Sequence, residues 1–183
     1  MPPPVRVTFS AGTTGAYRIE RVLPIAGEPL PAATHLTLHE GVWCTPADAA
    51  WSLRGVSGHV RYVESSEKQR LAGVTPPLGR PHATHAVLIP IRKSEAWWNL
   101  AQDERRAILE QRSQHIAIGT RYLPAIARRL SHSRELGEPF DFLTWFEYAP
   151  EHAARFDELL AALRATEEWN YVEHEVELRL RRL

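Results

Sequence analysis

The sequence has little cysteine, no excess of either charge, and no long apolar run. Its 183 residues contain one cysteine, Cys44, which excludes an internal disulfide and a site built from several thiolates. The 22 Lys and Arg residues balance 22 Asp and Glu residues, so the chain lacks the positive charge with which nucleic-acid binders neutralise phosphates. No run of about 18 apolar residues occurs, and the first residues lack a signal peptide's apolar segment. We therefore expect a cytoplasmic protein that binds neither nucleic acid nor a membrane.

Several common catalytic motifs are also missing from the sequence. It has no glycine-rich phosphate loop, no His-Glu-x-x-His and no Gly-x-Ser-x-Gly, so phosphoryl transfer and triad hydrolysis lose their usual support. His35 and His39 share a face, but no carboxylate or cysteine completes an obvious zinc site around them.

What the chain does have is an ordinary globular composition and many histidines and tryptophans. Hydrophobic residues make up 44% of it, which is enough for one domain or two tightly packed halves with a sizeable core. Nine His and six Trp suit a metal or cofactor pocket, although histidines scattered over the surface are the commoner explanation.

The order of apolar patterns predicts a strand-rich first half and a mixed second half. In the first half, alternation and turn residues favour strands, followed by a short helix at 64–72. The second half should contain a buried strand at 83–93, a helical run at 97–131 that Pro124 interrupts, and a further strand, helix and strand. The expected strands of the first half are 5–10, 16–24, 35–39 and 51–63, and the last three elements are 141–148, 150–166 and 171–180.

His115 and Arg128 are the two residues of the helical run that invite a functional interpretation. Gly119 follows His115 by about one turn, and a helical glycine costs about 1 kcal/mol relative to alanine. A flat macrocycle lying against the helix would explain this glycine, and so would a core histidine with a chance glycine. Arg128 can reach the same pocket only if the chain bends, which Pro124 permits; otherwise it is a surface charge.

Five stretches and His115 together resemble the haem-dependent chlorite dismutase family. Their order and spacing match from about residue 51 to the end of the chain, and the match is weaker before that. The stretches are 88–98 (LIPIRKSEAWW), 103–108 (DERRAI), 122–128 (YLPAIAR), 137–152 (GEPFDFLTWFEYAPEH) and 163–169 (LRATEEW).

The resemblance implies a fold and an assembly. The fold is a dimeric α+β barrel made of two ferredoxin-like halves, which would be residues 1–82 and 83–183 of one compact unit. The short chain is similar to the compact branch of the family, in which the N-terminal half is trimmed and the protein is a homodimer.

The resemblance also implies the residues of a haem b site. His115 would be the axial ligand of the iron, Arg128 the arginine on the opposite, distal side, and Glu168 the carboxylate behind the histidine, with Glu167 as a neighbouring alternative. The remaining positions are Lys93, Trp97 and Tyr62 near the haem propionates or edge, Phe146 on the distal side, and Thr75 where some relatives are expected to carry Gln. Thr75 is too short to hold the guanidinium, so we expect a more mobile Arg128.

The implied activity is the conversion of chlorite to chloride and O₂ with formation of an O–O bond. In this family the reaction passes through ferric haem and a transient pair of ferryl iron and hypochlorite, which Arg128 would retain. Two alternatives stay open. The first is a coproheme decarboxylase or peroxidase-like protein of the same superfamily, which the distal arginine disfavours. The second is a haem-binding or stress protein whose chlorite activity is incidental.

Overall fold

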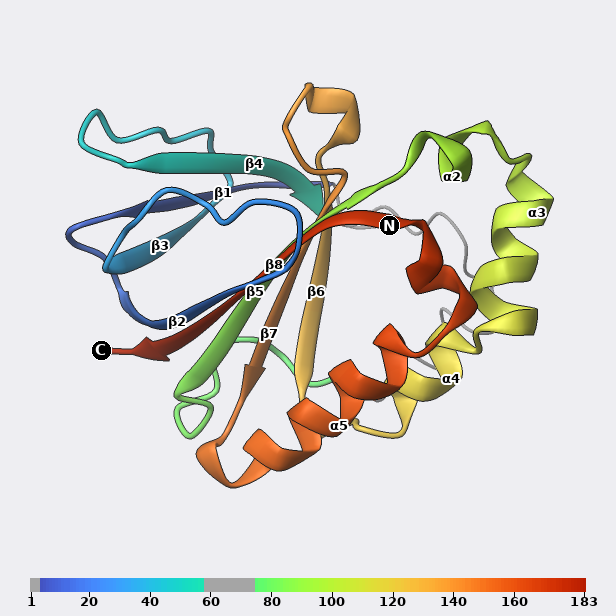
Figure 1. The fold of residues 1–183 in the computed structure, drawn as a ribbon. Coiled ribbons are helices and arrows are strands. Elements are labelled where there is room, and N and C mark those ends of the chain that lie inside the picture. Colours follow the sequence, from blue (N-terminus) through green and yellow to red (C-terminus); the bar gives the residue numbers. More distant parts are fainter. Residues whose placement is uncertain (1–3, 58–74) are drawn as a thin grey trace.

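Eight antiparallel strands form a closed barrel in the computed structural model, which describes residues 4–57 and 75–183. Figure 1 shows the strands as one curved sheet and the helices gathered on one side of it. The strands are β1 (Val5–Gly12), β2 (Tyr17–Ala26), β3 (His35–Glu40), β4 (Trp51–Ser57), β5 (His85–Lys93), β6 (Ala127–His132), β7 (Phe142–Tyr148) and β8 (Val172–Arg182).

The strand order repeats a single pattern twice around the barrel. Its sequence of neighbours is β1-β3-β2-β8-β5-β7-β6-β4, closed by pairing of β4 with β1. Read as β4-β1-β3-β2 and β8-β5-β7-β6, each half places its fourth strand beside its first and its third beside its second. The predicted α+β barrel of two ferredoxin-like halves is confirmed. The predicted division into halves at residues 82/83 stays a prediction, because strands from both halves pair with each other in one closed barrel.

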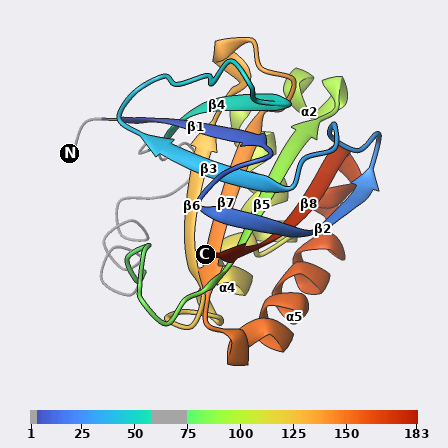
Figure 2. The ribbon, with the colours of Figure 1, turned by 90° about the vertical axis from the view of Figure 1, so that its left-hand side faces the viewer.

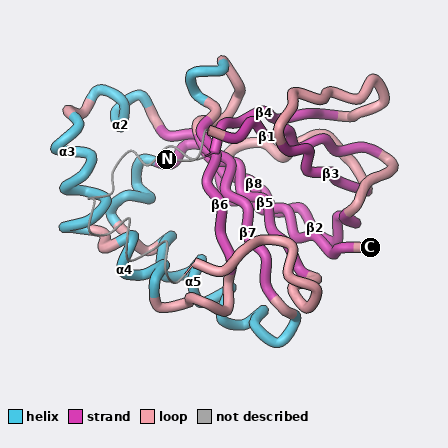
Figure 3. The backbone as a smooth tube through the Cα atoms, turned by 180° about the vertical axis from the view of Figure 1, so that it is seen from behind, coloured by secondary structure: helices cyan, strands magenta, loops and turns pink. Residues whose placement is uncertain are grey.

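All helical segments of the described residues belong to the second half of the chain. From β1 to β4 the described residues contain strands and connections but no helix, and Figure 2 shows this side of the barrel uncovered. Figure 3 shows the helices packed against the other strands. The helices are α2 (Glu95–Asn99), α3 (Gln102–Arg106), the π-helical segment η1 (Ala107–Arg112), α4 (His115–Thr120) and α5 (Ala153–Arg164). The part of the chain that the structure describes also has three 3₁₀ turns, η2 (Arg134–Leu136), η3 (Pro150–His152) and η4 (Glu167–Tyr171).

The predicted helical run at 97–131 is wrong in its last third. Helix α4 ends at Thr120, and β6 begins at Ala127, beyond the Pro124 that cannot donate a helix hydrogen bond. Strand β6 pairs with both β4 and β7, so its backbone groups find partners in the sheet instead of a helix. The predicted helix at 64–72 and the end of the predicted strand at 51–63 lie outside the described residues.

Two apolar layers explain why the strands of the second half are apolar on both faces. In β5, Ala86 and Leu88 point into the barrel, while Val87 and Ile89 point outward to the helices. Helix α5 supplies the outer layer with residues at helical spacing, namely Phe156, Leu159, Leu160 and Leu163. The outer layer is therefore a second core between sheet and helices. None of the described helices is long and apolar enough to cross a membrane.

Candidate functional site

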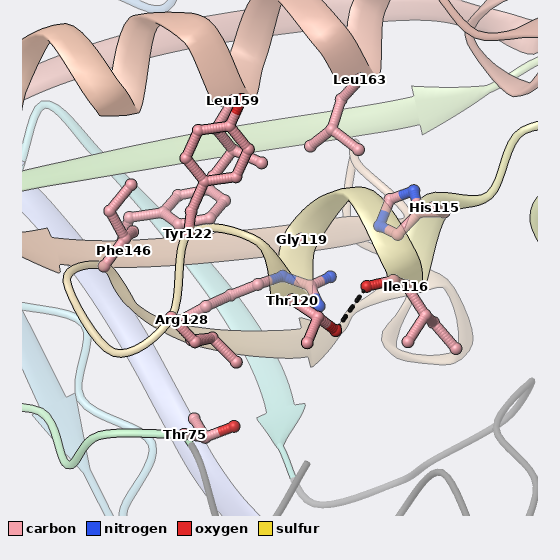
Figure 4. Close-up of a pocket in the computed structure, with 12 residues that line it drawn as sticks. Thr75, His115, Ile116, Gly119, Thr120, Tyr122, Arg128, Phe146, Leu159 and Leu163 are labelled. Carbon is pink, nitrogen blue, oxygen red and sulfur yellow. Dashed lines mark hydrogen bonds between the residues drawn. The ribbon is translucent and has the colours of Figure 1, made fainter. Parts of the chain in front are cut away.

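A pocket lies in the outer layer, between the sheet and helices α4 and α5. It holds about 730 Å³ of space not filled by atoms, part of which is open solvent. Most of the side chains around it are apolar, and Figure 4 draws the lining residues as sticks. The lining residues are Thr75, His115, Ile116, Gly119, Thr120, Tyr122, Leu123, Ile126, Arg128, Phe146, Leu159 and Leu163.

His115 is the first residue of α4 and lines the pocket directly after the turn at residues 113–114. The preceding Gln114 has φ of 52°, in the left-handed region that a side chain rarely adopts. The π-helical segment η1 ends just before this turn, and such segments often occur at functional sites. Nδ1 of His115 lies 2.7 Å from Oε2 of Glu168. The described residues offer its other ring nitrogen no hydrogen bond, so Nε2 is available to a ligand in the pocket.

Glu168 comes from the 3₁₀ turn η4, 53 residues after His115 in the chain, and is 5% exposed. Its Oε1 accepts a hydrogen bond of 2.8 Å from Nζ of Lys93. Burial by itself would raise the pKa of this carboxyl, but the charges and hydrogen bonds of His115 and Lys93 lower it to about 2. Glu168 is therefore an anion that contacts the imidazole of His115 on one side and the ammonium group of Lys93 on the other.

Glu167, the neighbouring alternative from the sequence, points elsewhere. Its Oε1 lies 3.0 Å from Nη1 of Arg112, and both side chains are substantially exposed. The geometry thus gives the contact with His115 to Glu168.

Lys93 and Trp97 lie behind Glu168 and are not among the residues that line the pocket. The ammonium group of Lys93 is 4.3 Å from the centroid of the Trp97 ring, close enough for a cation–π contact. Burial lowers the pKa of Lys93, while Glu168 opposes that shift. The indole Nε1 of Trp97 is buried and has no hydrogen-bond partner in the described part of the chain. Cofactor contacts by Lys93 and Trp97 stay predictions, and Tyr62 lies outside the described residues.

Arg128 faces the pocket because of its register in the sheet. On β6 it stands directly opposite Phe146 on β7, and directly opposed residues share a face, here the outer face covered by helices. By accessible surface the side chain of Arg128 is exposed, toward the pocket that it borders, while the protein atoms packed around its guanidinium desolvate it and lower its pKa. No described residue forms a hydrogen bond or ion pair with it. Arg128 is thus free to bind an anion.

Thr75 also borders the pocket, where Figure 4 shows it beyond the side chain of Arg128. Its side chain is exposed and has an interaction of its own with the protein. The structure therefore brings four of the predicted site residues, His115, Arg128, Phe146 and Thr75, to one pocket.

The residues present fit a flat, iron-containing macrocycle such as haem b. A Cβ added at Gly119 would meet nothing within 4 Å, so this face of α4 leaves room for a ring against the helix. The imidazole of His115 is a suitable iron ligand with a carboxylate behind it, and apolar walls suit a porphyrin.

Sequence reasoning missed the residues that build the apolar wall. Leu159 and Leu163 from α5, together with Ile116 and Ile126, line the pocket. The amphipathic spacing of α5 was visible in the sequence, but periodicity identifies only a buried face and does not reveal that a pocket interrupts it.

Comparison of the sequence with protein families and curated proteins finds chlorite dismutases. The family model described as chlorite dismutase matches residues 35–181. The chlorite dismutase of Ideonella dechloratans is 28% identical over 129 residues, which are 68% of this chain and 42% of that protein. The chain thus spans less than half the length of this curated relative.

Comparison of the structure finds the same fold in solved proteins. A dimeric chlorite dismutase from Nitrobacter winogradskyi is 56% identical, with a TM-score of 0.90 and coverage of 97% of this chain and 99% of that one. A mutant chlorite dismutase from Candidatus Nitrospira defluvii is 20% identical, with a TM-score of 0.66 and coverage of 98% and 91%. At that lower identity the likeness concerns the fold alone.

Proposed function

Because this chain belongs to the chlorite dismutase family, we propose that it is a haem b enzyme that converts chlorite, ClO₂⁻, to chloride and O₂. The observation that carries the proposal is the meeting of His115 and Arg128 in one pocket, with Glu168 bonded to the far side of the imidazole. These three residues come from α4, β6 and η4. Decomposition of chlorite on haem needs an iron ligand, a group that binds the anion, and a charge behind the ligand.

His115 would hold the haem iron through Nε2, and Glu168 would act on the iron through this ligand. A carboxylate that accepts the Nδ1 proton makes an imidazole more basic and fixes its orientation. Haem, when bound, supplies the redox chemistry that breaks a Cl–O bond and forms the O–O bond. Lys93 holds Glu168 in its anionic form, since it donates to Oε1 while His115 occupies Oε2.

Arg128 would bind chlorite and retain the hypochlorite that forms from it. Arginine has the highest pKa of the common side chains, so its guanidinium stays cationic at neutral pH even where burial lowers that pKa. The apolar side chains that line the pocket would strengthen its attraction for an anion. Because Thr75 is short, we expect the guanidinium to move between orientations in the pocket.

An oxygen-electrode trace after chlorite is added to haem-loaded protein tests the proposal. We expect rapid O₂ release. If no O₂ is released while the haem stays intact, the proposed function is refuted. Incubation with iron coproporphyrin and peroxide is the matching test for the rival decarboxylase, for which loss of propionate carboxylates would be the sign.

Substitution of Arg128 separates retention of the oxidant from binding of the cofactor. Arg128→Ala should keep haem but lower the O₂ yield per chlorite and hasten bleaching, because hypochlorite escapes. Arg129→Ala is a matched control, since the neighbouring Arg129 pairs with Glu40 and is not part of the pocket lining. Equal yields and lifetimes for the two variants would contradict the role of Arg128.

Substitution of His115 tests the iron ligand directly. His115→Ala should bind haem weakly or without order, and a normal five-coordinate histidine-ligated spectrum in this variant would refute the assignment.

The assembly we propose is a cytoplasmic homodimer. The structural relative at 56% identity is described as dimeric, and the lone Cys44 provides no internal disulfide.

A further inference from the structure

Glu168 is held at its backbone as well as at its carboxylate. Its carbonyl oxygen accepts a hydrogen bond of 3.2 Å from Nζ of Lys93, the same group that donates to Oε1. Its backbone N–H donates to Oγ of Ser113 at 3.0 Å, in a hydrogen bond that is buried from solvent. The two backbone contacts approach Glu168 from different elements, β5 and the end of η1.

Ser113 stands two residues before His115, in the same turn. It is 4% exposed, and its own N–H donates to the carbonyl of Ile108 at 3.0 Å. Glu110 ties the turn to the start of α4, since its carbonyl accepts from the N–H of Gln114 and its Oε1 accepts from the N–H of Ile116. A single rigid turn therefore presents a hydroxyl and an imidazole to the same glutamate.

We infer that Ser113 is a positioning residue that sets the distance and angle between Glu168 and His115. The inference deepens the proposed function and rests on it where it concerns the iron. Ser113 fixes the backbone of Glu168 and His115 meets its carboxylate, so the two contacts form a closed loop of hydrogen bonds between η4 and the turn before α4. In such a loop a shift of the Glu168 backbone also moves its carboxylate relative to Nδ1 of His115.

Removal of the hydroxyl leaves a buried donor without its acceptor. An unsatisfied buried N–H is costly, so η4 in Ser113→Ala should shift until this N–H reaches water or another oxygen. The shift would move Oε2 away from Nδ1 although neither His115 nor Glu168 has been altered. The effect on the iron would pass through the imidazole, without any contact between Ser113 and the cofactor.

The first test uses cofactor-free protein and is independent of haem. The Glu168 amide should exchange its hydrogen at least tenfold faster in Ser113→Ala than in the wild type, and the proton NMR signal of the hydrogen-bonded Nδ1–H of His115 should broaden or move upfield. Ser113→Thr keeps the hydroxyl and should restore both signals, while Ser113→Cys, with its weaker acceptor, should lie between. Unchanged exchange and an unchanged imidazole signal in Ser113→Ala would overturn the inference.

The second test uses haem-loaded protein and a signal that a purely structural role would leave unmoved. The iron–histidine stretching frequency should fall in Ser113→Ala and return in Ser113→Thr. Ser131→Ala is the matched control, because Ser131 is 1% exposed but lies on β6, away from Glu168. An unchanged frequency in Ser113→Ala, or an equal fall in Ser131→Ala, would refute the positioning role. If the wild type fails to bind haem, the proposed function falls, while the cofactor-free test still decides whether Ser113 positions Glu168.

Discussion

Replacing Lys93 with methionine removes one charge from a buried pair while keeping a long apolar side chain in its place. The side chains of Lys93 and Glu168 are 4% and 7% exposed, and Nζ and Oε1 are 2.8 Å apart. Breaking a buried pair by deleting one partner typically costs about 3–5 kcal/mol, because the remaining charge loses its compensation. Glu168 keeps its bond to His115, so we expect the lower end, about 3 kcal/mol in the free energy of unfolding.

The assay is urea unfolding of the cofactor-free protein, followed by tryptophan fluorescence at neutral pH. For a chain of this size, a loss of about 3 kcal/mol corresponds to a fall in melting temperature of roughly 6–12 °C. The double variant Lys93→Met/Glu168→Gln should lose less than the sum of the single variants, because removal of both charges leaves neither uncompensated.

The neighbouring residue provides a matched control. Nε of Arg92 lies 2.7 Å from Oε1 of Glu173, but both side chains are 45% exposed. Solvent-exposed pairs contribute about 0–1 kcal/mol, so Arg92→Met should change stability little. If Lys93→Met costs no more than Arg92→Met, or if the double variant loses the full sum, burial does not make the Lys93–Glu168 pair costly to break.

Two further predictions concern Gly119 and Tyr17. Gly119→Ala should stabilise the cofactor-free protein by up to about 1 kcal/mol and yet release haem faster, because its new methyl group enters the space left at this face of α4; haem transfer to apomyoglobin measures this, and an unchanged rate contradicts it. Burial and the charge of Glu147 raise the pKa of Tyr17 from 10 to about 12. The unfolded chain therefore loses this proton first, and stability should fall between pH 10 and 12 in urea titrations. Tyr17→Phe should show a shallower fall, and identical pH profiles would refute the shift.

Much of the fold was predictable because strand patterns are local. Alternation in residues 35–39 and the apolar run at 83–93 predicted strands that the structure contains as β3 (His35–Glu40) and β5 (His85–Lys93). The strand β6 escaped prediction, because Ile126 and Leu130 fit a helical period as well as a strand. What made β6 a strand was pairing with β4 and β7, whose residues are distant in sequence.

The candidate site was predictable only where a resemblance supplied the residues. The helical spacing of apolar residues at 97–131 predicted that His115 lies in a helical run. The same spacing made Arg128 a surface charge unless the chain bends between the two residues. The contact between Lys93 and Glu168 joins residues 75 positions apart, and the bond from Glu168 to Ser113 spans 55. No local pattern reveals such pairs, because a hydrogen bond between distant residues leaves no periodicity in the sequence.

By itself, the sequence determined most of the strands and, through its resemblance to a known family, the class of fold and the residues expected at a haem site. Each strand or helix buries its own apolar face, so the spacing of apolar residues within a short window of sequence predicts the type of element. Only the tertiary structure decided that Arg128 faces the pocket, that Glu168 and not Glu167 meets His115, and that Ser113 holds Glu168 from behind. Those outcomes depend on strand register and on the meeting of distant turns, which exist only after the barrel has closed.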